Sequence, residues 1–107
     1  MKNRKLTPLK KETQLNFLIK RKREEDFVLL YHSLWGKECI DLMSLVEEWK
    51  NDEGEEEVFS INSWDLPHAF TAFSITRVPA LVTCKKGKIH VEDRFSAIRK
   101  FFTVGRV

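Results

Sequence analysis

The hydrophobic period changes at Gly36, and this change constrains the fold more than any other feature of the chain. Before the glycine, residues 27–34 (FVLLYHSL) are rich in β-forming side chains, as in a strand buried on both faces of a sheet. After it, apolar side chains recur at the 3.6-residue spacing of a helix: Cys39, Ile40, Met43, Val46 and Trp49. A buried strand that leads directly into an amphipathic helix predicts an α/β fold.

The segment before this strand predicts another helix, and its first residues allow two interpretations. Thr7 followed by Pro8 is a suitable helix start, and the helical pattern runs to about Arg23, with these apolar positions: Leu9, Leu15, Leu18 and Ile19. Residues 5–9 are also compatible with a short first strand.

The middle of the chain predicts a short strand and a short helix. The acidic loop NDEGEEE is followed by VFSIN, residues 58–62, which has the composition of a strand. Residues 65–73 then predict a helix with Asp65 as its cap.

The last third predicts a hairpin and a final helix. Residues 78–84 (VPALVTC) have the pattern of a buried strand, and KKGK places Gly87 where a turn needs a positive φ. Residues 89–91 return as a brief strand. Asp93 then caps a helix whose apolar face holds Phe95, Ile98, Phe101 and Phe102. Alternating strands and helices followed by a hairpin predict a sheet with parallel and antiparallel parts.

Length and composition favour a single domain over residues 1–107, because 107 residues suffice for one hydrophobic core. No apolar run is long enough to cross a bilayer or resembles a signal peptide, so we expect a cytoplasmic protein without a membrane partner. Cys39 and Cys84 are too few for a disulfide scaffold and should be thiols. The histidines, His32, His68 and His90, have no metal-binding spacing relative to them, so we predict neither metal nor cofactor.

Charge is segregated along the chain. Residues 1–25 carry nine Lys or Arg against three acids, whereas residues 37–57 carry nine acids against two lysines. A basic segment can bind nucleic acid, but the run KRKR at 20–23 has no interleaved aromatic side chains to stack on bases. We therefore interpret both segments as solvated and do not expect a nucleic-acid partner.

Three stretches resemble the thioredoxin family, and together they span nearly the whole chain. FVLLYHSLWGKEC resembles the strand and Trp-Cys-Gly-Pro-Cys loop of that family, SITRVPALVTCKKGK its cis-proline segment and hairpin, and RFSAIRKFF its last helix. The resemblance implies a thioredoxin-like three-layer sandwich, in which helices flank a central mixed sheet and Pro79 is a cis-proline.

The resemblance also implies a degenerate active-site loop. Gly36 stands at the position of the family's first cysteine, Lys37 and Glu38 at the intervening positions, and Cys39 at the second cysteine. The first cysteine is the exposed nucleophile of such a motif. Leu30 stands where thioredoxin has a buried aspartate that assists proton transfer.

The chain has two cysteines, and neither stands at the position of the nucleophile. Glu38 should raise the pKa of Cys39, so we interpret Cys39 as a buried thiol, with a redox thiol as the alternative. Cys84 lies five residues beyond Pro79 on the predicted strand, too far to replace the missing cysteine.

The family binds extended peptides in a groove, and the resemblance assigns that groove here to Trp35, Gly36, Lys37, Val78 and Pro79. The alternatives to a binding role are that Trp35 packs against a helix and that Pro79 only shapes the fold. We expect a redox-inactive thioredoxin-like protein that serves as an interaction or adaptor module with a protein partner; the sequence predicts no particular oligomeric state. Its small size and lysine-rich composition would suit a bacteriophage or other accessory gene product.

Two alternatives remain open. One is a single-cysteine thiol oxidoreductase or thiol sensor that uses Cys39. The other is an accessory protein that grips an anionic polymer through its basic N-terminal segment.

Overall fold

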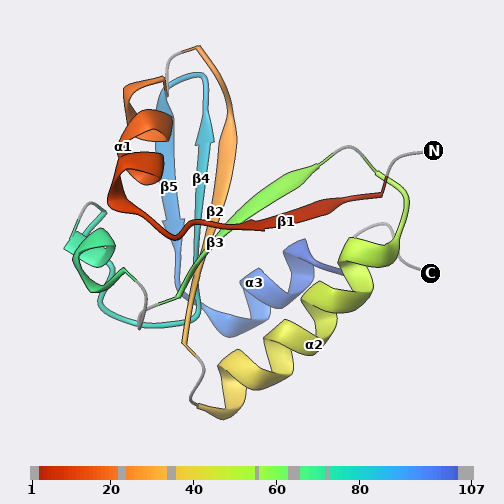
Figure 1. The fold of residues 1–107 in the computed structure, drawn as a ribbon. Coiled ribbons are helices and arrows are strands. Elements are labelled where there is room, and N and C mark those ends of the chain that lie inside the picture. Colours follow the sequence, from red (N-terminus) through yellow and green to blue (C-terminus); the bar gives the residue numbers. More distant parts are fainter. Residues whose placement is uncertain are drawn as a thin grey trace.

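The computed structural model is a five-stranded sheet with helices on both faces (Figure 1). It describes residues 3–21, 24–33, 36–54, 56–62, 66–71 and 73–103. The elements in chain order are β1 (Lys5–Pro8), α1 (Glu12–Lys20), β2 (Phe27–His32), α2 (Lys37–Asn51), β3 (Glu57–Asn62), the 3₁₀ helix η1 (Pro67–Thr71), β4 (Ala80–Lys85), β5 (Lys88–Glu92) and α3 (Phe95–Phe101).

The sheet is mixed, as the sequence predicts. Its strand order is β1-β3-β2-β4-β5, with β1, β3 and β2 mutually parallel. β4 is antiparallel to β2 and pairs with β5 as a hairpin. The central strand β2 carries four fully buried or nearly buried side chains in succession, Leu29, Leu30, Tyr31 and His32, which explains its unbroken β-forming pattern.

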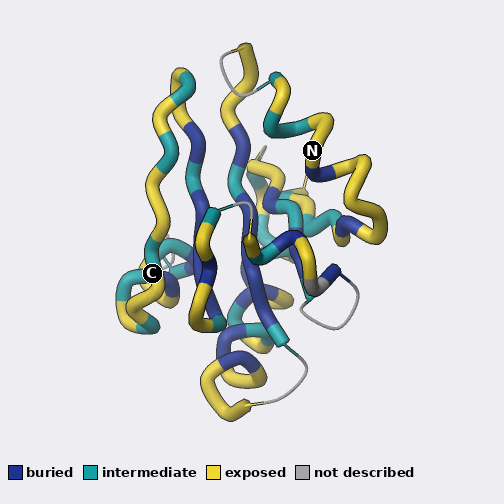
Figure 2. Tube along the Cα trace, turned by 90° about the vertical axis from the view of Figure 1, so that its left-hand side faces the viewer, coloured by how far each residue is buried: buried dark blue, intermediate teal, exposed yellow. Residues whose placement is uncertain are grey.

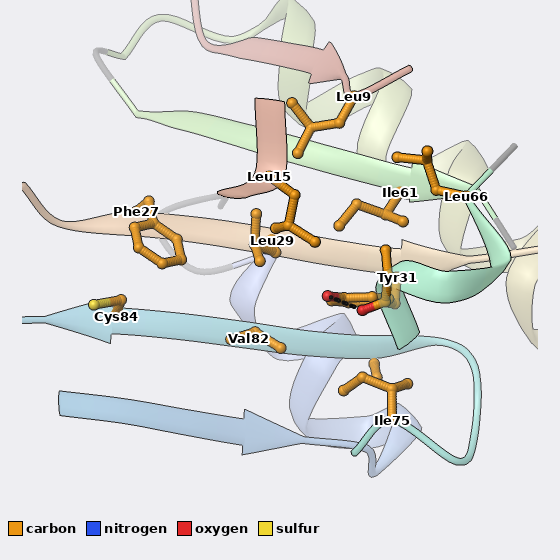
Figure 3. Packing of buried hydrophobic residues seen from close by; sticks show 12 residues of the cluster. Leu9, Leu15, Phe27, Leu29, Tyr31, Ile61, Leu66, Ile75, Val82 and Cys84 are labelled. Atoms are coloured by element: carbon orange, nitrogen blue, oxygen red, sulfur yellow. Dashed lines mark hydrogen bonds between the residues drawn. The ribbon is translucent and has the colours of Figure 1, made fainter. Parts of the chain in front are cut away.

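Each face of the sheet is covered by a separate layer of helix. On one face, Leu15 of α1 and Ala69 of η1 join a core cluster with Leu29 and Tyr31 of β2 (Figure 3). On the other, side chains of α2 and α3 pack on the sheet: Leu42, Val46, Trp49, Ile98 and Phe102. Because successive β2 side chains point to opposite faces, one strand supplies both clusters. The result is the three-layer sandwich that the sequence predicts.

Aromatic side chains make contacts in the helical layer on each face of the sheet. The Tyr31 hydroxyl donates a hydrogen bond of 3.1 Å to the Ala69 carbonyl oxygen, and its ring meets Phe70 edge to face. On the other face the rings of Trp49 and Phe102 are also edge to face, with centroids 5.3 Å apart. Burial raises the pKa of Tyr31, so the phenol stays protonated as a donor.

The first element differs from the helix predicted to begin at Pro8. Residues 5–8 instead form β1, and α1 begins at Glu12. The Lys5 amide donates to the Glu56 carbonyl and the Leu9 amide to the Ser60 carbonyl, so pairing with β3 satisfies this backbone. The short-strand interpretation of residues 5–9 is therefore the correct one, because sheet pairing outweighs the local Thr-Pro signal.

Two details of the helices were also predicted wrongly. Arg94, not Asp93, occupies the N-cap of α3, and its amide donates to Glu92 Oε2 at 3.0 Å. In α2, Ile40 is 57% exposed, and Leu42 is buried in its place. The buried stripe follows Cys39, Leu42, Val46 and Trp49, a spacing that turns Ile40 outward.

Other boundaries agree more closely. The hairpin turn has a positive φ at Lys86 and at Gly87, as predicted for the glycine. The strand predicted over residues 27–34 ends at His32, the predicted strand over 78–84 begins at Ala80, and η1 is shorter than the helix predicted over 65–73. The proposed cap Asp65 lies outside the described residues. Among the described helices, none has the length and apolarity needed to cross a bilayer.

Candidate functional site

The predicted loop and the proline segment meet at one end of the sheet. β2 ends at His32, and after a short connection α2 begins at Lys37. Tyr31 pairs with Ala80, so the start of β4, directly after Pro79, lies beside the end of β2 (Figure 1). The fold therefore brings these two segments together although they are about forty residues apart in sequence.

The proline segment has the predicted backbone. The peptide bond between Val78 and Pro79 is cis, which confirms that prediction. Pro79 is buried, whereas Val78 is half-buried. Of the other predicted groove residues, Gly36 and Lys37 are exposed, and Trp35 lies outside the described residues.

Gly36 occupies a backbone conformation that suits glycine. It is the N-cap of α2, with φ 93° and ψ 135°, and its carbonyl accepts the Ile40 amide at 3.1 Å. A Cβ added there would meet no described atom within 4 Å, so space does not select glycine. The positive φ does, because residues with a Cβ rarely adopt it. The backbone at this helix start is therefore one that favours glycine over residues with a side chain.

Cys39 is the third residue of α2 and is only 2% exposed. Burial is the main cause that raises the pKa of its thiol, and the charge of neighbouring Glu38 raises it further. A hydrogen bond from the backbone of Ser33 acts in the opposite direction and lowers that pKa. The net shift is upward, so Cys39 is protonated at neutral pH. Sequence reasoning identified the effect of Glu38 but not the larger effect of burial.

A shallow depression of about 300 Å³ borders the thiol. It is lined by Ser33, Cys39, Ile40, Met43, Ser44 and Glu47. Four of these residues share one side of α2, at positions i, i+3, i+4 and i+7 from Ile40. The sequence analysis did not predict this depression, although the exposed Ile40 lines it.

Cys84 lies in a different layer of the molecule. It is fully buried on β4 within the core cluster beneath α1. Its partner in the sheet is Phe27, four residues before Tyr31 on β2, so it lies about 13 Å of strand away from the loop end. Figure 3 shows Cys84 and Tyr31 toward opposite ends of these strands. Neither cysteine forms a disulfide.

The position behind the loop is apolar. Leu30 is fully buried and pairs with Ser60 of β3 on the face covered by α2. A leucine offers no proton to a thiol and accepts none. Within the described ranges, no three His, Cys, Asp or Glu side chains gather closely enough to hold a metal ion.

The basic segment is partly engaged in ion pairs. Arg21 follows α1, and its Nη2 lies 2.9 Å from Glu25 Oε1. Arg4 pairs with Glu56 at 2.8 Å, which ties the N-terminal strand to the acidic loop. Lys22 and Arg23, the other half of the basic run, lie outside the described residues.

Comparison with solved structures identifies the architecture. A thioredoxin from Fasciola hepatica superposes with a TM-score of 0.71 at 21% identity, covering 91% of this chain and 96% of the other. The chain has a thioredoxin-like fold. Thioredoxin NaTrxh from Nicotiana alata gives a TM-score of 0.73 at 12% identity, covering 100% of this chain and 97% of that one. Thioredoxin O2 from Arabidopsis thaliana, in its oxidized state, gives 0.69 at 17% identity, with 90% of each chain covered.

The sequence itself gives no such match: no family model and no curated protein matches it. At these identities the likeness to solved thioredoxins concerns the fold, and function has to be argued from the site.

Proposed function

We propose that this chain is a redox-inactive thioredoxin-like protein that binds a protein partner as an interaction or adaptor module. The observation that carries the proposal is the state of the loop. The thiol of Cys39 is buried with a raised pKa, and the sequence resemblance to thioredoxins places Gly36 where the redox motif has its exposed cysteine. Disulfide exchange requires an accessible thiolate, and this arrangement disfavours one on both counts.

The binding surface we assign is the groove of Trp35, Gly36, Lys37, Val78 and Pro79. The described members lie at one end of the sheet, and Gly36 and Lys37 are exposed there. An extended segment of a partner would run beside residues 78–79 and pair with the backbone like an added strand. Trp35 is assigned to this surface from the sequence alone. This binding needs no thiol chemistry.

A second candidate function has one observation in its favour. The thiol of Cys39 borders a surface depression and receives a backbone hydrogen bond that lowers its pKa. A single-cysteine oxidoreductase or thiol sensor would use that thiol to form mixed disulfides. Burial outweighs this hydrogen bond, so we place this function second.

Partner capture with matched variants separates the two functions. The full chain is immobilised beside Cys39→Ser and Val78→Asp, and the proteins retained from its natural host are compared without reductant, so that mixed disulfides survive, and again after a wash with reductant. We expect Cys39→Ser to retain the same proteins as the unaltered chain, because binding does not use the thiol. We expect Val78→Asp to lose them, because an aspartate puts a charge into the groove.

The control is Ser96→Asp, which adds the same charge at an exposed position of α3. Thermal unfolding of each variant shows whether it remains folded. Loss of the captured proteins with Cys39→Ser would contradict the adaptor proposal and favour the thiol function. Equal loss with Val78→Asp and Ser96→Asp would remove the groove from the proposal.

A further inference from the structure

The strand β5 is an edge strand of the sheet, with a paired strand on one side. It pairs with β4, and among the described residues no segment pairs with its other side. Figure 2 shows β5 as a largely exposed strand beside the buried β4. Val91 on this strand is 41% exposed, and Ile89 lies at the margin of the core cluster beneath α1. The unpaired backbone groups of such an edge strand can pair with another chain.

The hairpin register determines which backbone groups face outward. The two-residue turn of Lys86 and Gly87 makes Lys85 and Lys88 the first hydrogen-bonded pair. Hydrogen-bonded pairs alternate along an antiparallel ladder, so His90 and Glu92 also bond to β4. The N–H and C=O groups of Ile89 and Val91 therefore point away from the sheet.

The sequence of β5 is complementary to itself around His90. In an antiparallel pair of two β5 strands centred on that residue, Ile89 of one copy faces Val91 of the other. Both have outward backbone groups, so this register makes four backbone hydrogen bonds. It also sets Lys88 opposite Glu92 at both ends, which is an attractive cross-strand pair.

The neighbouring registers with the same hydrogen-bonding phase are less favourable. Centring on Ile89 places Lys88 opposite His90, and centring on Val91 places Lys88 opposite Arg94. The second is directly repulsive, and the first becomes so when the histidine is protonated. Charge along residues 88–94 is otherwise balanced, because Lys88 and Arg94 match Glu92 and Asp93. Net repulsion between two copies of this segment is therefore small.

The opposite margin of the sheet is protected against such pairing. In β1 the amides of Lys5 and Leu9 bond to β3, so the alternate residues Leu6 and Pro8 face outward. Proline has no N–H to donate, and a proline in an edge strand commonly prevents pairing with another chain. β5 contains no proline.

We propose that the outer side of β5 is an interface between two copies of this chain. The two strands pair antiparallel about a two-fold axis at His90 and join the two sheets into one continuous sheet. Ile89 and Val91 make the backbone bonds, and Lys88 of each copy pairs with Glu92 of the other. Because the strand is short, the dimer belongs to the weak, concentration-dependent class.

Sedimentation velocity of the full chain over a broad concentration range tests the association. We expect a reversible shift from monomer to dimer. Val91→Pro removes an outward N–H without touching the bonds to β4, and we expect its dissociation constant to rise by about tenfold or more. Val91→Thr keeps the N–H and the β-branched shape, and it should still associate.

A charge variant repeats the test without altering the backbone. Lys88→Glu sets like charges opposite each other at both ends of the interface, so we expect weaker association. Lys20→Glu makes the same change in net charge on an exposed residue of α1 and should associate normally. Thermal unfolding of every variant checks that it folds.

Disulfide trapping tests the register itself. His90 faces its own copy at a non-hydrogen-bonded position, with Cα atoms about 4.5 Å apart, close enough for a disulfide. Air oxidation of His90→Cys should therefore give a covalent dimer. In Lys88→Cys the two new thiols would be about 13 Å apart along the strands and should cross-link far less.

Three results would overturn the proposal. They are a monomer at every concentration, association that Val91→Pro and Lys88→Glu leave unchanged, and equal cross-linking of His90→Cys and Lys88→Cys.

Discussion

Cys39 and Cys84 are both buried and neither forms a disulfide, but they lie in different surroundings. Cys84 is fully enclosed within a core cluster, where the sheet and α1 surround it. Cys39 lies in the first turn of α2, borders a surface depression and has a charged neighbour. A buried cysteine in a sheet behaves as a small apolar side chain. A buried cysteine at a helix start can still border the surface and accept a backbone hydrogen bond that favours its thiolate. Its reactivity depends on how far burial outweighs these two effects.

The largest difference that we expect between them is in native alkylation. Iodoacetamide should reach Cys84 only when the core unfolds, so its rate in the native protein should be at least about a thousandfold below its rate in denaturant. Cys39 needs only local opening of the first turn of α2 and should react faster than Cys84. Mass spectrometry of each peptide over time gives both rates. Equal native rates would show that the two sites open together, and the two cysteines would then not differ in accessibility.

The next effect concerns the backbone that leads into Cys39. We expect Gly36→Ala to lower the free energy of unfolding by about 1–3 kcal/mol, because φ 93° with ψ 135° belongs to a region that residues with a Cβ avoid. Ser44→Ala, on an exposed side of α2, serves as the control and should change it little. Urea unfolding measures both variants.

A Gly36→Cys variant has the same backbone cost, and Leu30 remains buried behind the loop. We therefore expect it to reduce insulin poorly although it restores the spacing of the redox motif. Unchanged stability of Gly36→Ala, or fast insulin reduction by Gly36→Cys, would contradict the backbone cost that we assign to this position.

Serine substitution should affect the two positions unequally. Cys84→Ser places a hydroxyl in the sheet core, and we expect a loss of about 2 kcal/mol in the free energy of unfolding. Cys39→Ser retains an acceptor for the Ser33 backbone and borders the surface, so we expect a loss of about 1 kcal/mol or less. Paired urea unfolding curves measure the difference. A larger loss for Cys39→Ser would mean that its thiol packs more tightly than that of Cys84.

The smallest effect is the contribution of Glu38. Its negative charge disfavours the thiolate, so Glu38→Gln should lower the pKa of Cys39 slightly while leaving it above that of a free thiol. The pH dependence of the alkylation rate gives this pKa. Glu48→Gln, a matched change elsewhere on α2, should have less effect. A drop below the free-thiol range would mean that Glu38, and not burial, holds the thiol protonated.

Much of the fold could be predicted because local patterns and sheet pairing agree. The change of period at Gly36 and the turn at Gly87 follow from local sequence, the cis-proline at Pro79 was implied by the resemblance to thioredoxins, and each is present. The sequence left two interpretations open where a distant partner decides the outcome. Residues 5–8 form a strand because β3 pairs with them, and no local signal outweighed Thr-Pro.

The site could be predicted only in part. The sequence places a lone cysteine after Gly36, but the positive φ of that glycine and the dominant effect of burial on Cys39 depend on tertiary structure. The depression along α2 depends on the outward rotation of Ile40, which the helical pattern assigned to the buried face. Trp35 and Asp65 lie outside the described residues, so their predicted roles stay predictions.

The most direct test is the alkylation rate of Cys39 across pH in the native protein, measured beside insulin reduction. We predict a rate that rises with pH toward a midpoint above the free-thiol value of about 8.5, with insulin left unreduced. A midpoint well below that value, with rapid alkylation at neutral pH and reduction of insulin, would contradict the redox-inactive interpretation and make Cys39 a catalytic thiol.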